Sequence, residues 1–281
     1  MKLVMTLLVR NEEDIIREQI LFHLNMGVDF LIATDNNSSD STSEILQEFV
    51  NKGLLHLIVE KEDNYAQAEW VTRMARIASS KYHADWVINS DADEFWWPSA
   101  CGLKDVLGNA PNDVFVLQVQ RSDFIPRNEI EGSIFHRMII KNLDSMNHVG
   151  DPLPPKICHR GMDEIIIDQG NHTVLSPSGL KSMNTDAMEI LHFPMRSLRQ
   201  FSNKIALGGA AYERNMELPA YIGDGWRRLY KMYLKGDLAE YYSSRVIDQI
   251  TIDSGIQDRK YIFDTKLRDY LIKERIISPI K

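Results

Sequence analysis

The sequence predicts an α/β fold built around a mostly parallel central sheet that is flanked by helices. Over residues 1–95, short apolar runs alternate with segments whose apolar residues recur at helical spacing. This alternation predicts parallel strands joined by right-handed crossovers. Polar residues directly follow each expected strand. Because parallel strands end at one edge of a sheet, these polar residues should line a shared ligand crevice.

Four expected strands alternate with three expected helices in this first part. The strands span residues 2–9, 29–34, 54–59 and 85–90. The helices span residues 12–26, 42–50 and 66–81. Ile16, Ile20 and Leu24 recur at the spacing of one helix face. Ser41 and Glu44 form a capping box that predicts where the second helix begins.

After Pro98 the pattern changes to short strands separated by glycine-containing turns, which predicts a mixed α+β half that extends the first sheet. The expected strands are residues 114–119, 134–140, 157–159, 164–167, 173–175 and 189–193. Helical spacing returns at Arg196, and the expected helices are residues 196–207, 221–242 and 260–276. The chain therefore divides into three expected parts, residues 1–98, 99–210 and a C-terminal helical extension over 211–281.

The composition is that of a globular protein, with 44% hydrophobic and 26% charged residues. A net charge of −8 argues against a nucleic-acid partner, because a phosphate backbone attracts a basic surface. The apolar run at residues 3–9 is too short for a signal peptide, and we expect no transmembrane segment. Cys101 and Cys158 offer no disulfide framework. Together these features predict a cytoplasmic protein.

The segment from Trp86 to Pro98 carries three carboxylates within four residues, directly after an apolar run. Asp91 and Asp93 are two residues apart, so an extended chain would direct both to one side. Two oxygen ligands with open positions beside them suit Mg²⁺ or Mn²⁺ that also holds substrate phosphates. The alternative is a solvated acidic turn that caps a following helix.

Polar residues also follow the other three expected strands. Arg10 and Asn11 follow the first strand, residues 35–37 follow the second, and residues 60–64 follow the third. Asp35 is either a ligand-binding carboxylate or the cap of its own loop. The first loop lacks Gly-x-Gly-x-x-Gly, and the chain lacks a P-loop motif, which argues against a Rossmann dinucleotide site and a P-loop nucleotide site.

Taken together, these segments resemble the family 2-like glycosyltransferases of the GT-A fold, in the branch whose acidic motif reads Asp-x-Asp-Glu-Phe. The resemblance covers about residues 1–210, and the segments that carry it are residues 8–12, 35–42, 86–95 and 191–197. It implies one GT-A-like domain, with a nucleotide-sugar-binding first part, an acceptor-side second part and a mostly parallel sheet. It also implies transfer of a sugar from a nucleotide-diphosphate donor to an acceptor hydroxyl.

The resemblance implies a set of donor-binding residues, namely Arg10, Asn11, Asp35, Asn37, Asp63, Asp91, Arg196 and Lys204. Asp35 would contact the nucleobase or ribose, and Asp63 would read the base after the third strand. Arg196 and Lys204 would neutralise the leaving diphosphate, whose developing charge must be stabilised.

The resemblance further implies that Asp91 and Asp93 hold Mn²⁺ or Mg²⁺, with His192 as the third protein ligand. An ion held by such an Asp-x-Asp (DXD) motif would bridge the donor diphosphate and act as a Lewis acid. His192 lies between Leu191 and Phe193 on an apolar segment. Its alternative role is that of a buried core histidine.

An inverting transfer, which the family implies, requires a general base near the acceptor hydroxyl. Many relatives carry a Glu-Asp pair before a helix, and this sequence has no such pair at a convincing place. Glu94 and Asp168 are the candidate bases that we name, and Asp163, Glu164 and Glu189 compete with them.

Two other functions remain open at this point. The chain could bind nucleotide sugars without turnover, or it could be a nucleotidyltransferase, although residues 10–13 lack the Gly-rich basic loop of that class. The acceptor could be a glycan, a lipid-linked molecule or a small molecule. Residues 226–233 combine cationic and aromatic side chains at helical spacing, which fits either peripheral membrane contact or an ordinary amphipathic helix.

Overall fold

The computed structural model describes residues 1–99, 102–127, 132–146, 150–176, 179–219 and 221–280. The chain forms two compact units. Unit 1 contains Met1–Glu62, Ala66–Arg121 and Pro154–Leu191. Unit 2 contains Asp63–Tyr65, Ser122–Leu153 and His192–Lys281. The expected boundary after residue 98 lies within unit 1, and the one after residue 210 lies within a helix of unit 2.

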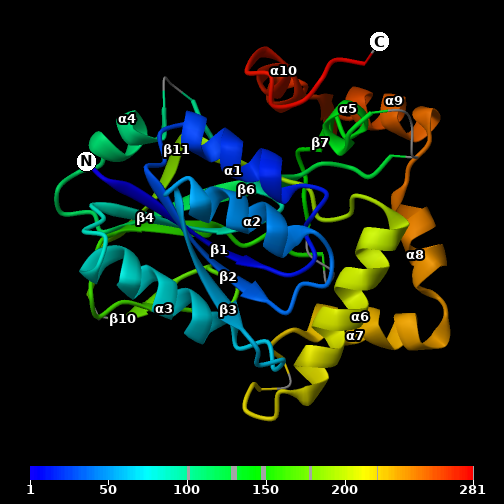
Figure 1. The fold of residues 1–281 in the computed structure, drawn as a ribbon. Helices are drawn as coiled ribbons and strands as arrows, with labels where there is room; N and C mark the ends of the chain where they lie inside the picture. The colour runs from blue at the N-terminus through cyan, green and yellow to red at the C-terminus, as the bar shows by residue number, and fades with distance from the viewer. Residues whose placement is uncertain (100–101, 128–131, 147–149, 177–178, 220, 281) are drawn as a thin grey trace. The chain divides into compact units, whose positions relative to one another are not determined.

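Unit 1 is built on the four parallel strands that the sequence predicted (Figure 1). They are β1 (Leu3–Val9), β2 (Phe30–Asn36), β3 (Leu55–Glu60) and β4 (Trp86–Asp91). β1 lies between β2 and β4, and β3 pairs with the other side of β2. The alternation of strands and helices therefore predicted both the elements and their parallel pairing.

Helices cover both faces of these strands. They are α1 (Ile16–Asn25), α2 (Thr42–Asn51) and α3 (Gln67–Ser80). Met5 of β1 belongs to the same apolar cluster as residues of α1 and α2, whereas its neighbour Val4 belongs to the cluster that contains Val71 and Met74 of α3. Successive strand side chains point to opposite faces, so β1 must be apolar at almost every position.

The second part of the chain extends this sheet, as predicted. β8 (Lys156–Arg160) pairs antiparallel with β4, and β6 (Val116–Asp123) pairs antiparallel with β8. β11 (Ser182–His192) and β5 (Glu94–Pro98) follow. Among the described residues the order is β3-β2-β1-β4-β8-β6-β11-β5. The predicted α/β class with a mostly parallel central part and mixed strands beyond it is thus confirmed.

Smaller elements complete unit 1. α4 (Leu103–Gly108) follows β5, and β9 (Ile166–Ile167) pairs antiparallel with β10 (Val174–Ser176). The loop between these two short strands carries Asp168. Cys158 is buried in β8, and Cys101 lies outside the described residues.

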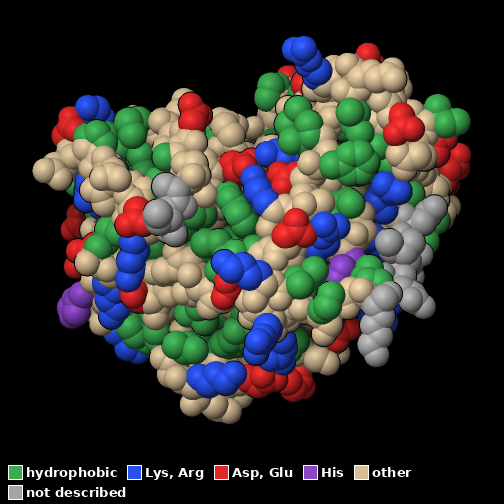
Figure 2. All heavy atoms as spheres, turned by 90° about the horizontal axis from the view of Figure 1, so that it is seen from above, with side chains coloured by type: hydrophobic (Ala, Val, Ile, Leu, Met, Phe, Trp, Pro, Cys, Tyr) green, Lys and Arg blue, Asp and Glu red, His purple; other side chains and the backbone are tan. Residues whose placement is uncertain are grey.

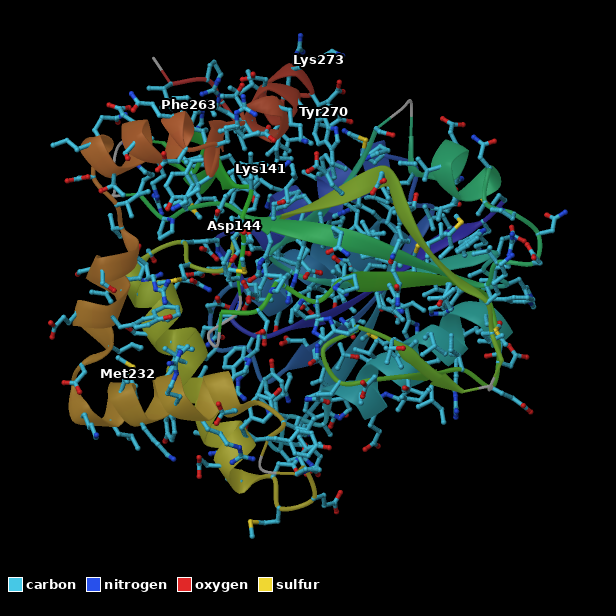
Figure 3. The ribbon with its side chains drawn as sticks, turned by 180° about the vertical axis from the view of Figure 1, so that it is seen from behind. Lys141, Asp144, Met232, Phe263, Tyr270 and Lys273 are labelled. Carbon is cyan, nitrogen blue, oxygen red and sulfur yellow. The ribbon has the colours of Figure 1, made fainter. Side chains whose placement is uncertain are left out.

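Unit 2 combines a two-stranded sheet with helices (Figure 3). β7 (Ile140–Asn142) pairs antiparallel with β12 (Tyr261–Phe263), and these strands carry the labelled Lys141 and Phe263. The helices of its described residues are α5 (Ile134–Arg137), α6 (Leu198–Arg214), α7 (Asp224–Lys235), α8 (Leu238–Arg245), α9 (Gln249–Gln257) and α10 (Lys266–Lys273).

The expected helix over 260–276 was wrong at its start, because residues 261–263 form the strand β12 and only Lys266–Lys273 is helical. Two further predictions for unit 2 were wrong. The expected strand over 134–140 is mostly the short helix α5, because Ser133 and His136 form a reciprocal capping box at its start. The expected helix over 221–242 is divided into α7 and α8 at Gly236, whose φ of 86° is a left-handed conformation that glycine adopts readily. Both departures come from local capping that outweighs apolar periodicity.

Charged side chains of both signs are interspersed over the face shown in Figure 2. In unit 1, Arg17 NH2 lies 2.6 Å from Glu48 Oε1, and Lys104 Nζ lies 2.5 Å from Asp29 Oδ1. Exposed pairs of this kind contribute little to stability, because water screens their charges. No helix of the described residues has the length and apolar character needed to cross a bilayer.

Gly161, which directly follows β8, allows two backbone segments to approach closely. A Cβ at this position would come within 1.9 Å of the Ala84 carbonyl oxygen. We therefore expect Gly161→Ala to lower the free energy of unfolding by about 2 kcal/mol or more, as measured by urea denaturation. Gly108→Ala is the matched control, because nothing lies within 4 Å of that Cβ position. Equal stability of the two variants would contradict this account.

His23 of α1 holds the backbone of β5. Its Nδ1 hydrogen-bonds with the Gln19 carbonyl at 2.8 Å, and its Nε2 accepts the Trp96 backbone N–H at 3.1 Å. The side chain is fully buried, and burial lowers the pKa of His23 to about 3. The stacking of Phe22 on Trp97 strengthens the same contact between α1 and β5.

This buried histidine predicts a loss of stability in acid. The unfolded chain protonates His23 below about pH 6.5, whereas the folded chain resists protonation until about pH 3. His23 should therefore contribute a decrease of up to about 1.4 kcal/mol per pH unit as the pH falls from about 6 to 4. His23→Gln should remove that part of the slope in denaturation curves. The exposed His83→Asn should keep it, and parallel curves for wild type and His23→Gln would refute the assignment.

Candidate functional site

The carboxyl ends of β1, β2 and β4 lie level with one another in unit 1. Val9 pairs with Asp35 across β1 and β2, and Leu8 pairs with Asp91 across β1 and β4. The loops that leave these strands therefore start from the same edge of the sheet, which is where ligands bind in open α/β sheets. The predicted convergence of these polar strand ends is present in the fold of unit 1.

Two asparagines connect the loops at this edge. Asn11 Oδ1 accepts the Ser39 backbone N–H at 2.7 Å, and Asn37 Nδ2 donates to the Lys61 carbonyl at 3.0 Å. Both asparagines adopt positive φ, 55° and 57°, a conformation that asparagine tolerates better than most residues. Arg10 lies half-buried beside Asn11. These contacts explain why asparagine suits each strand end without requiring a ligand.

Asp35 is buried and engaged by its own loop. Its Oδ1 accepts the Ser38 backbone N–H at 3.1 Å, and its Oδ2 accepts a short hydrogen bond from the Ser43 hydroxyl. The loop-capping role that the sequence left open is therefore present. A ligand-binding role for Asp35 stays a prediction.

The acidic motif forms a tight turn between β4 and β5. The Asp91 backbone N–H donates to Glu94 Oε2 at 3.1 Å, which closes the turn. Asp93 and Glu94 are buried, with exposed fractions of 2% and 0%. A strand follows the turn, so the alternative of a solvated helix cap was wrong.

A buried lysine, which the sequence analysis did not identify, pairs with this turn. Lys156, the first residue of β8, is 1% exposed. Its ammonium group forms a short ion pair with Asp91 Oδ2 and lies 3.2 Å from Glu94 Oε1. Arg121 NH1 lies 3.5 Å from the same Glu94 oxygen. The two carboxylates and two cations have no net charge together.

The second oxygen of Asp91 also has protein partners. Asp91 Oδ1 accepts hydrogen bonds from Asn171 Nδ2 at 3.3 Å and from Gln67 Nε2 at 3.5 Å. Asp91 is thus held by an ammonium group and two amides, a set that does not fit an open metal ligand. Within the described part of the chain, no three acidic, histidine or cysteine side chains are grouped as a metal site. The role of Asp91 as a metal ligand stays a prediction.

His172 lies next to the start of β8. Its Nδ1 hydrogen-bonds with the Pro155 carbonyl at 2.8 Å. Burial, and then the charge of Lys156, lower the pKa of His172 to about 4. This neutral histidine supports the backbone that carries the lysine.

The two candidate bases have different surroundings in unit 1. Glu94 is fully buried and lies against Lys156 and Arg121, a placement that favours support of the turn over proton abstraction. Asp168 is half-buried in the β9–β10 loop, where its Oδ1 accepts the Gln169 N–H at 2.7 Å. Its carbonyl accepts the Asn171 N–H at 3.1 Å. Asp168 thus shapes the loop from which Asn171 reaches Asp91.

His192, the last residue of β11, belongs to unit 2. Its Nδ1 lies 2.6 Å from Asp123 Oδ1, and the side chain is 12% exposed. When Nδ1–H donates to the carboxylate, the lone pair of the ring is on Nε2. A carboxylate behind histidine in this way is typical of metal-binding histidines.

Of the other predicted donor residues of unit 2, Asp63 and Arg196 have partners within that unit. Asp63 forms an ion pair with Arg214, whose Nε also donates to the Asp63 carbonyl at 3.0 Å. Arg196 is 1% exposed, and its NH1 donates to the Phe193 carbonyl at 3.2 Å. Lys204 is half-buried on α6. The burial of Arg196 favours a structural role, and donor contacts for all three stay predictions.

The family model described as Glycosyltransferase family 92 matches residues 5–160. The matched segment is more than half of the 281 residues, and it runs from β1 to the end of β8. It therefore contains the parallel strands, the acidic turn and Lys156. No curated protein matches the sequence significantly.

Several solved structures show a distant likeness. Residues 1–349 of S. aureus TarS match with a TM-score of 0.45 and 13% identity, covering 83% of this chain and 71% of that chain. The mannosyltransferase PcManGT from Pyrobaculum calidifontis, solved with GDP-Man and Mn²⁺, matches at 0.42 and 14%, covering 82% and 69%. Glucosyl-3-phosphoglycerate synthase from Mycobacterium tuberculosis, solved with Mn²⁺ and UDP-Glc, matches at 0.31 and 18%, covering 43% of each chain.

Proposed function

Because this chain belongs to glycosyltransferase family 92, we propose that it transfers a sugar from a nucleotide-diphosphate donor to an acceptor hydroxyl. The family match over residues 5–160 is the observation that carries this proposal. The matched segment contains the strand ends that open α/β sheets use for ligands. The acceptor classes that we consider are a glycan, a lipid-linked molecule and a small molecule.

We propose that the donor binds at the carboxyl edge of the parallel strands. Arg10, Asn11, Asp35 and Asn37 are the candidate contacts for the nucleoside, and Asp91 is a further one. The hydrogen bonds among these loops support this choice, since they hold the polar groups in fixed positions before a donor arrives. Asp63, Arg196 and Lys204 of unit 2 are kept as candidate donor contacts on the family resemblance alone.

We further propose that Mn²⁺ or Mg²⁺ takes part, with Asp93 and His192 as protein ligands. The chemistry of both side chains suits such an ion, and the hydrogen bond that His192 Nδ1–H donates to Asp123 would hold His192 in the metal-binding tautomer. Bound there, the ion would neutralise charge that develops on the leaving diphosphate. We propose an inverting transfer in which Asp168 takes the acceptor proton, because Glu94 is buried beside two cations.

Donor binding and turnover test this proposal. Calorimetry with UDP, GDP and CDP, each with and without Mn²⁺, should show metal-dependent binding of at least one nucleotide. Release or transfer of sugar from the matching donor should follow. Stable binding of an intact donor would instead favour a binding protein without turnover. If no nucleotide bound under either condition, the glycosyl-transfer proposal would fail.

Asp93→Asn should weaken metal-dependent nucleotide binding by about tenfold or more, because it removes a charged oxygen ligand. The fold should persist, as checked by thermal unfolding without ligand. Asp105→Asn is the matched control, since Asp105 is an exposed carboxylate on α4 of the same unit. Full binding by Asp93→Asn would exclude Asp93 as a ligand.

The pairing of His192 with Asp123 predicts a graded series in unit 2. Asp123→Asn should lower Mn²⁺ affinity by about 10–100-fold, and His192→Ala should lower it further. Asp144→Asn, in the turn after β7 (Figure 3), should leave Mn²⁺ affinity unchanged. Spin-resonance titration of free Mn²⁺ measures each affinity. An unaffected His192→Ala variant would leave His192 with a purely structural role.

A further inference from the structure

A lysine of the chain itself is built into the acidic turn. Lys156 extends from the start of β8, which pairs with β4, and its ammonium group lies between the carboxylates of Asp91 and Glu94. The lysine is 1% exposed, so its ammonium group is shielded from solvent. A buried lysine is costly unless carboxylates compensate its charge, and here two of them do.

Two cations offset two of the three carboxylates of the turn, and Asp93 is the third carboxylate. Asp91 and Glu94 supply two negative charges, and Lys156 and Arg121 supply two positive charges. A carboxylate whose charge a neighbouring ammonium group offsets gives a divalent cation little electrostatic attraction. An ion that bound to Asp91 would have to displace the lysine ammonium group or lie beside it, and both cost free energy.

The amides on the other side of Asp91 reinforce this arrangement. Asn171 and Gln67 both donate to Oδ1, while Lys156 holds Oδ2. Each carboxylate oxygen therefore already accepts from a protein group. These contacts hold the Asp91 carboxylate in one position in the turn. Binding a metal ion through it would require breaking some of these hydrogen bonds each time.

We propose that Lys156 is a positioning residue, the permanent counter-cation of Asp91 and Glu94, and that Asp91 is not a ligand of the divalent ion. The lysine keeps the turn in one conformation whether or not an ion is bound. This inference rests on the proposed function for the role of the ion. Asp91 can still contact the donor, since its side chain is 30% exposed.

The first test removes both partners of the ion pair at once. The double variant Asp91→Asn with Lys156→Met keeps the net charge of the cluster, so it isolates the loss of the carboxylate. Its Mn²⁺ affinity, measured by spin-resonance titration without donor, should stay within about threefold of wild type. Asp93→Asn serves as the reference for loss of a true ligand. A loss in the double variant as large as that in Asp93→Asn would overturn the proposal.

The second test removes the lysine alone. Lys156→Met leaves the cluster with one net negative charge and should raise Mn²⁺ affinity by about tenfold, because the cation then meets unmasked carboxylates. Lys104→Met removes an exposed lysine of the same unit that pairs with Asp29, so it controls for total charge and should have no effect. An unchanged affinity in folded Lys156→Met would overturn the proposal. If this variant does not fold, the double variant decides.

The outcomes separate this inference from the proposed function. If wild type binds Mn²⁺ too weakly to measure, the titrations are repeated with UDP or GDP present, and no binding in any variant overturns the inference. If the wild-type protein consumes no donor but the Mn²⁺ affinities of the variants follow the predicted order, the proposed role of Lys156 is supported and glycosyl transfer is excluded. If the wild-type protein consumes a donor but the double variant does not bind Mn²⁺, glycosyl transfer is supported and the proposed role of Lys156 is overturned.

Discussion

The in-register parallel pairing of β1 with β2 and β4 is the constraint on which the site depends. It sets Asp35 and Asp91 level at the carboxyl edge of the sheet, each across from the end of β1. A shift of one residue would turn every side chain of a strand to the opposite face. The two apolar clusters, one with α1 and α2 and the other with α3, prevent such a shift because alternate residues of β1 belong to each.

Charge compensation is the second constraint. Burial of Glu94 and Lys156 would be unfavourable for either one alone, since removal of a partner from a buried pair costs about 3–5 kcal/mol. The partly exposed Asp91 and Arg121 complete the cluster. Together they stabilise a turn whose shape depends on β8 as much as on the acidic motif. The conformation of the turn therefore depends on the pairing of β8 with β4 as well as on the residues of the acidic motif.

The fold class and the four parallel strands could be predicted because apolar periodicity is a local signal that each segment carries by itself. The class of enzyme could be predicted from the segments that end those strands. The branch could not, since the sequence resembled the family 2-like enzymes, whereas the matching family is 92.

What the sequence could not reveal was the partner of the acidic motif. Lys156 directly precedes an apolar segment, and in the sequence it looks like an ordinary charged residue at the end of a strand. Its meaning arises only from the antiparallel pairing of β8 with β4, in which Ile88 lies opposite Cys158. Likewise, Glu94 was a plausible base because the residues next to it in the sequence do not indicate that it is buried against two cations.

The strand order has a consequence for how the protein is made. β5 directly follows β4 in the chain, yet β4 pairs with β1 on one side and, on the other, with β8 from a much later segment. Contacts between segments so far apart form slowly, because a long loop must close first. During synthesis, the emerging chain would hold Asp91 and Glu94 in water until β8 arrives with its lysine. The acidic turn is thus assembled late, and a nascent chain that ended after β5 would lack its counter-charge.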